Sequence, residues 1–136
     1  MNRVPTLIGI GGPFKGEVFY LDYLRPLVVG RSRQADISVK RTAHYRAQNE
    51  HDRESDADTK TISAKHFQIT FFNLKSIELK NLSVNGTLLD GLPVKDAALI
   101  QDISNQPHEI QFGTHARFKL ALCEREENKD EPLPLE

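Results

Sequence analysis

The stretch Ser63–Thr87, SAKHFQITFFNLKSIELKNLSVNGT, indicates the fold of this 136-residue chain. Apolar residues alternate with polar ones over His66–Phe71 and again over Ser76–Lys80. An alternation with a period of two is typical of a strand that buries one face. Asn85-Gly86 then predicts a tight turn, because both residue types tolerate a positive φ. The stretch therefore predicts two strands and a turn.

Strands of the same kind extend from this stretch in both directions. Runs of apolar, β-branched and aromatic residues predict further strands at Thr6–Ile10, Glu17–Leu21, Leu27–Val29, Ile37–Val39, Thr87–Leu89, Ala98–Ile100, Glu109–Phe112 and His115–Leu122. Ten or eleven short strands without an amphipathic helix predict an all-β fold, a β-sandwich. The length suits one domain, placed at residues 1–123, whose core buries roughly two-thirds of the unfolded surface.

Residues 40–61 interrupt the strand pattern. Between Lys40 and Lys60 the chain has five basic and five acidic residues but only four apolar ones. Such a segment buries too little apolar surface to offset the entropy lost on ordering. We therefore predict a mobile polar loop inserted into the sandwich, with one weak helical turn around Thr42–Asn49.

The charge of the chain is distributed unevenly. The net charge is −1, and residues 124–136 hold six acidic and two basic residues, which leaves +3 for the remainder. This acidic, proline-containing tail is predicted to be disordered. A net charge of +3 is compatible with an anionic ligand but too small for a general nucleic-acid binder.

The cellular setting is predicted from what the sequence lacks. A single cysteine, Cys123, excludes an internal disulfide framework and fits a reducing compartment. No signal peptide and no apolar run of membrane-spanning length is visible. We therefore expect a monomeric cytoplasmic protein without membrane or nucleic-acid partners.

Three loop motifs each follow a strand-like run: Gly30-Arg31-Ser32, Ser63-Ala64-Lys65-His66 and Asn81–Thr87. A phosphate monoester presents about two negative charges and three strong acceptor oxygens. A receptor for it needs a fixed guanidinium, because arginine offers planar bidentate donors and stays charged. Arg31 follows a predicted strand and Ser63 lies just before one, so we expect both at one rim of the sandwich. These motifs predict an anion-binding site.

The order and spacing of the three motifs resemble those of the forkhead-associated (FHA) domain, a β-sandwich that reads phosphothreonine in partner proteins. The resemblance covers Thr6 to Leu122. It implies that Arg31 and Ser63 contact the phosphate and that Asn85 holds the backbone of the ligand peptide. By the same resemblance, His66 supports the loops from behind.

The remaining motif residues complete the implied site. Gly30 and Gly86 supply the backbone geometry of their loops. Ser32 and Lys65 belong to the implied phosphopeptide-binding set, and Lys65 adds positive charge. Ala64 stands where the family often has a polar side chain, so only its backbone N–H is available to the ligand.

The resemblance implies a phosphothreonine-dependent module in Ser/Thr kinase signalling, with a kinase or its substrate as partner. The alternative is a phosphate-independent FHA-fold interaction or assembly domain. Ala64 and Val84 favour this alternative, because members of the family often have a polar side chain at the first position and Ser or Thr at the second. No nucleophile–base pair or carboxylate dyad stands at a suggestive spacing, and His44, His51 and Asp52 match no zinc pattern. We therefore expect neither an enzyme nor a bound metal or cofactor.

Overall fold

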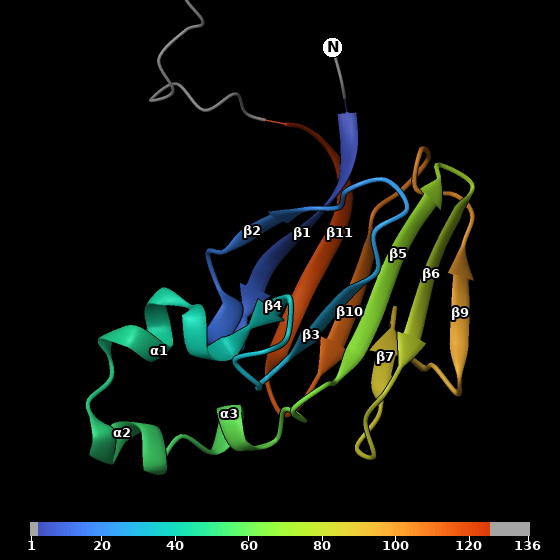
Figure 1. Cartoon of the computed structure of the whole chain (residues 1–136). Helices are drawn as coiled ribbons and strands as arrows, with labels where there is room; N and C mark the ends of the chain where they lie inside the picture. Colours follow the sequence, from blue (N-terminus) through green and yellow to red (C-terminus); the bar gives the residue numbers. More distant parts are fainter. Residues whose placement is uncertain (1–2, 126–136) are drawn as a thin grey trace, which may run out of the picture.

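The computed structural model describes residues 3–125, which form two β-sheets that pack face to face (Figure 1). The first sheet has the order β2 (Val18–Tyr20), β1 (Arg3–Gly11), β11 (Ala116–Glu124), β10 (His108–Phe112), β7 (Thr87–Leu89) and β8 (Leu92–Pro93). The second has the order β4 (Ile37–Ser38), β3 (Leu27–Gly30), β5 (Phe67–Asn73), β6 (Ser76–Asn81) and β9 (Ala97–Ile100). The predicted β-sandwich is confirmed.

The hairpin of β5 and β6 shows why the alternating pattern specifies this fold. In its antiparallel register Ile69 lies opposite Leu79, and Phe71 lies opposite Ile77. Ile69, Leu79 and Ile77 are fully buried. They pack into a core whose largest buried side chains are phenylalanines, including Phe67, which lies edge-on to Phe112. The apolar residues of each strand therefore face the opposite sheet.

All ten predicted strands are present, and β8 is an additional two-residue strand at the sheet edge. β11 extends beyond its predicted end and includes Glu124, which lies opposite Arg3 of β1. The guanidinium of Arg125 then bonds the carboxylate of Asp22 at 3.2 Å. The predicted tail thus overlaps the sandwich at its first two residues, and residues 126–136 lie outside the described part of the chain.

The insertion between β4 and β5 differs from the predicted irregular loop. It contains η2 (Val39–Arg41), α1 (Ala43–Ala47), α2 (Glu50–Glu54) and α3 (Ala57–Lys60). The helical turn predicted within Thr42–Asn49 is confirmed as α1, whereas α2 and α3 were not predicted. The side chains of Thr42, Asn49 and Asp56 each accept an N–H at the start of one α-helix. Polar capping bonds therefore help to order a segment whose apolar contacts with the core include Val39 and Tyr45.

The insertion packs beside η1 (Gly12–Phe14), and α3 leads into the lower end of β5 (Figure 1). The described segment, residues 3–125, has no helix long and apolar enough to cross a membrane.

Candidate functional site

The strand topology brings the three predicted loops to one end of the sandwich. Strand β3 ends at Gly30, and its antiparallel neighbour β5 begins at Phe67. Strand β6 ends at Asn81, and β7 begins at Thr87 beside it (Figure 1). The loops between these ends form one rim, here called the recognition rim and defined by residues 30–32, 63–66 and 81–87.

Two of these loops are joined through their backbones. The N–H of Arg31 donates to the carbonyl of Ser63 at 2.9 Å, and that of Ser32 donates to the carbonyl of Ala64 at 3.1 Å. Gly30 makes this approach possible, because an added Cβ would lie only 2.2 Å from the carbonyl oxygen of Ala64. A glycine is needed here because there is no space for a Cβ atom. Its backbone conformation is not the reason, because its φ is not in the left-handed region.

His66 links the second loop to the third from inside the fold. Its ring is fully buried and lies against Phe112, with ring centroids 5.3 Å apart. Nδ1 accepts the N–H of Ser63 at 3.0 Å, so the proton resides on Nε2, which donates to the carbonyl of Gly86 at 2.8 Å. Burial lowers the pKa of His66, although the bond to Gly86 acts in the opposite direction. The neutral imidazole thus holds both loops.

Asn81 organises the third loop, a role that we did not predict from the sequence. Its Oδ1 accepts the N–H of Ser83 at 3.1 Å, the hydroxyl of Ser83 at 2.8 Å and that of Thr87 at 2.9 Å. The hydroxyl oxygen of Ser83 in turn accepts the N–H of Gly86, whose φ is +93°. An asparagine just before a Ser- and Gly-containing turn is the signal that predicts such a bond.

Arg31 is a partly buried residue of the recognition rim. Its Nη1 donates to the backbone carbonyl of Lys60 at 3.2 Å. None of the carboxylates in residues 3–125 forms an ion pair with it. An arginine has five N–H donors, so the bond to one neutral carbonyl leaves the charge and most donors available.

Ser63 and Asn85 lie on the same rim as Arg31. The hydroxyl of Ser63 is partly exposed and has no hydrogen-bond partner within the described residues. Asn85 is exposed, and its Nδ2 donates to the carbonyl of Thr61 at 3.4 Å. A guanidinium, a hydroxyl and a carboxamide from three separate stretches therefore converge at one end of the sandwich.

The other predicted site residues lie on the same loops without joining this group through their side chains. The hydroxyl oxygen of Ser32 accepts the N–H of Gln34 at 3.1 Å and so closes its own turn. Ala64 and Lys65 are exposed on the second loop. Val84 has a relative exposure of 101%, which places a bare apolar side chain beside Asn85.

The arrangement is chemically suited to an anion. It combines a guanidinium that has no carboxylate partner among the described residues with an unbonded hydroxyl and a carboxamide on one rim. Among the described residues there is no group of three or more His, Cys, Asp or Glu side chains that could hold a metal ion.

The FHA domain profile matches residues 27–115, which is more than half of the chain. The search of curated proteins found no match to this chain. The fold is similar to that of the FHA domain of CT664 from Chlamydia trachomatis, at 23% identity with a TM-score of 0.62, covering 88% of this chain and 97% of that one. An Arabidopsis thaliana FHA domain is 21% identical with a TM-score of 0.65, covering 93% and 92%.

A third similar structure is the N-terminal FHA domain of Rad53p from S. cerevisiae in complex with a phosphothreonine peptide, at 18% identity with a TM-score of 0.60, covering 88% of this chain and 94% of that one. At these identities the likeness concerns the fold. The profile match includes all three loops of the recognition rim and the strands from β3 to β10. This chain therefore belongs to the FHA domain family.

Proposed function

We propose that this domain binds a phosphothreonine-containing segment of a partner protein at the recognition rim. The observation that carries the proposal is the guanidinium of Arg31, which has no carboxylate partner among residues 3–125 and lies on the rim with the free hydroxyl of Ser63. Phosphothreonine supplies about two negative charges and three acceptor oxygens, which match these donors.

Each rim residue has a distinct task in this proposal. Arg31 pairs with two phosphate oxygens, and Ser63 donates its hydroxyl to the third, assisted by the N–H of Ala64. Asn85 holds the peptide backbone, because a carboxamide has both donor and acceptor groups that match an N–H and a C=O. His66 contributes indirectly, since it holds the N–H of Ser63 and the carbonyl of Gly86.

FHA domains are interaction modules, and the partner proposed here is a Ser/Thr kinase or its substrate in cytoplasmic signalling. The domain would act as a monomer, without a cofactor. The Rad53p domain in its complex with a phosphothreonine peptide supports the proposal by analogy of fold.

The affinity is expected to be moderate, because Ala64 and Val84 offer no side-chain donor. A hydrogen bond to a charged group contributes about 1.5–3 kcal/mol. Restoring a hydroxyl with Val84→Thr should therefore strengthen phosphopeptide binding by about tenfold. Unchanged affinity in this variant would show that position 84 does not face the phosphate.

The decisive test is a screen with a phosphothreonine peptide library, followed by calorimetry on one selected sequence in phosphorylated and unphosphorylated forms. We expect only the phosphorylated form to bind. Arg31→Ala should lower the affinity for this form by about thirtyfold or more, because the charged partner of the phosphate is lost. Arg46→Ala is the matched control, since Arg46 is exposed on α1. Equal binding of the two peptide forms would refute phosphate dependence.

The second candidate is a phosphate-independent interaction or assembly domain, which the apolar Ala64 and Val84 on the rim favour. In that case a partner would bind unphosphorylated, and Arg31→Ala would retain its affinity.

A further inference from the structure

The end of α3 contacts two loops of the recognition rim through consecutive carbonyl groups. The carbonyl of Lys60 accepts from Nη1 of Arg31 at 3.2 Å, and that of Thr61 accepts from Nδ2 of Asn85 at 3.4 Å. The last carbonyls of a helix have no partner within the helix and need one from outside. Here the partners are the side chains of Arg31, which is proposed to bind the phosphate, and of Asn85, which is proposed to bind the peptide backbone.

We propose that the insertion of residues 39–61 is a positioning element of the recognition site, with Thr61 as the residue that fixes it in place. The expected effect of Thr61 on phosphopeptide affinity rests on the proposed function. Its structural part, that Thr61 sets the positions of Arg31 and Asn85 in the free protein, is independent of the ligand.

The hydroxyl of Thr61 is fully used in bonds that join the insertion to the turn between β10 and β11. It donates to the carbonyl of Asp58 at 2.7 Å. It accepts the N–H of Thr114 at 2.8 Å and the hydroxyl of Thr114 at 3.0 Å. The turn lies tightly against it, because a Cβ on Gly113 would be 3.0 Å from the hydroxyl oxygen of Thr61. Thr61 is therefore held from both sides.

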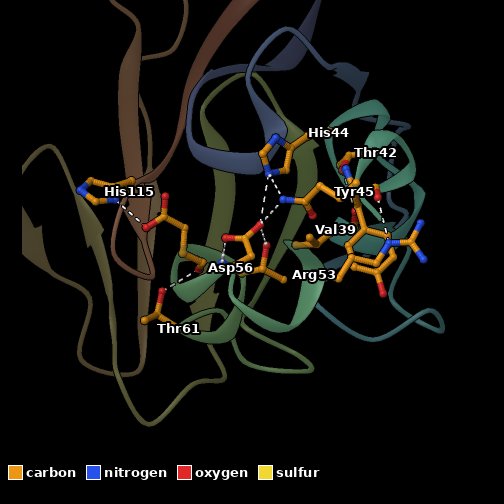
Figure 2. Close-up of polar contacts among 11 residues, drawn as sticks. Val39, Thr42, His44, Tyr45, Arg53, Asp56, Thr61 and His115 are labelled. Atoms are coloured by element: carbon orange, nitrogen blue, oxygen red, sulfur yellow. Dashed lines mark hydrogen bonds and ion pairs between the residues drawn. The ribbon is translucent and has the colours of Figure 1, made fainter. Parts of the chain in front are cut away.

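A second bond fastens the same end of the insertion to this turn. The ring of His115 contacts the carboxylate of Asp58 at 2.7 Å (Figure 2). Earlier in the insertion, the guanidinium of Arg53 lies 4.3 Å from the ring centroid of Tyr45, and its Nε donates to the carbonyl of that residue. The helices of the insertion are thus bonded to each other as well as to the sandwich.

Asp56 is the centre of the polar contacts that shape α3 (Figure 2). Its carboxylate accepts the N–H and the hydroxyl of Thr59 at 3.1 and 2.8 Å, and Nε2 of Gln48 at 3.0 Å. Nε2 of His44 lies 3.2 Å from it. Burial raises the pKa of Asp56, but these hydrogen bonds outweigh burial and lower the pKa to about 2. The start of α3 is thereby bonded as well as its end.

A carbonyl suits this positioning task better than a carboxylate would. It orients the guanidinium of Arg31 while leaving the positive charge available to a phosphate. Holding Arg31 and Asn85 in place before the ligand arrives reduces the conformational entropy lost on binding, which is the general benefit of preorganisation.

The test compares two substitutions that remove one buried or partly buried threonine hydroxyl each. Thr61→Val keeps the side-chain shape and loses the three bonds to Asp58 and Thr114. Thr42→Val is the control, since Thr42 is 1% exposed, caps α1 and bonds the carbonyl of Val39, away from the rim. We expect Thr61→Val to bind the selected phosphothreonine peptide about three- to tenfold more weakly than Thr42→Val does.

Two further measurements separate positioning from loss of stability. In an Asn85→Ala background, Thr61→Val should lower the affinity for the peptide by a smaller factor than in the wild-type background. The reason is that the Asn85 side chain, one of the two that Thr61 positions, is already absent. In the ligand-free protein, the NMR signals of the Asn85 carboxamide and the Arg31 Nε–H should shift in Thr61→Val and stay in place in Thr42→Val.

Equal affinity of the two threonine variants, or full additivity with Asn85→Ala, would overturn the positioning role while leaving phosphothreonine binding intact. If the wild-type protein binds phosphorylated and unphosphorylated peptides equally, the proposed function fails. The NMR comparison then decides the positioning role alone: unchanged signals in Thr61→Val refute it.

Discussion

Gly30→Ala tests whether close contact between two loops, and not loop sequence alone, builds the recognition rim. The added Cβ would lie 2.2 Å from the carbonyl oxygen of Ala64, 2.7 Å from its carbonyl carbon and 3.0 Å from Cα of Lys65. All three atoms are backbone, so no side chain can rotate away. The loop at residues 63–66 must instead separate from the end of β3.

The cost of that separation follows from the distances. Restoring an ordinary contact requires a shift of roughly 1 Å, which lengthens the bonds from Arg31 to Ser63 and from Ser32 to Ala64 beyond hydrogen-bonding distance. Their loss costs about 0.5–1.5 kcal/mol each, and overpacking adds about 1–3 kcal/mol. We expect the free energy of unfolding to fall by about 2–6 kcal/mol and Tm by on the order of 10–20 °C.

The assay is thermal and urea unfolding of Gly30→Ala, together with phosphothreonine peptide binding at a temperature where the variant stays folded. The matched control is Gly16→Ala, where φ is +88° and no atom lies within 4 Å of the added Cβ. In this variant the free energy of unfolding should fall only by the cost of a positive φ at a non-glycine residue, about 1–2 kcal/mol, and the peptide affinity should be unchanged. A Gly30→Ala protein as stable and as tightly binding as the Gly16→Ala protein would refute the reasoning.

Three other predictions concern stability and its pH dependence. Asn81→Ala should lower the free energy of unfolding by about 2–4 kcal/mol, because three donors lose their acceptor; a loss below about 0.5 kcal/mol in urea unfolding contradicts this. Since the pKa of Asp56 is about 2 against an ordinary 3.8, its ionised form adds stability above pH 3.8 that is lost as the pH falls towards 2. Acid titration should show this loss in the wild type and not in Asp56→Asn. Burial lowers the pKa of His108, but bonds to Asp90 and Asp102 outweigh it and raise the pKa above 6.5. The stability difference between wild type and His108→Gln should thus be largest below pH 6.5 and shrink as the pH rises through the raised pKa; a pH-independent difference speaks against it.

The strands were predictable because their signal is local. The alternation of Phe67, Ile69 and Phe71 places successive side chains on opposite faces wherever the chain is extended, and a single buried face then follows. The loop motifs that carry Arg31 and Ser63 were visible for the same reason: each is a few residues long and directly adjoins a strand end.

The insertion was predicted only in part: α1 was expected, but α2 and α3 were not, because most of their order comes from polar bonds. Composition correctly indicates that residues 40–60 cannot form a core of their own, but Asp56 and Thr42 order them through capping bonds. Such bonds depend on exact positions in short helices and do not appear in a count of apolar residues.

The sequence by itself determined which segments become strands and which short loops carry donors for an anion, since both depend on neighbouring residues. Only the tertiary structure decided that Lys60 holds Arg31, that Thr61 holds Asn85, and that Thr114 bonds Thr61 from 53 positions further along the chain. These contacts are made by backbone carbonyls and a hydroxyl, groups that are common along any chain. They acquire a role only when folding brings distant segments within hydrogen-bonding distance.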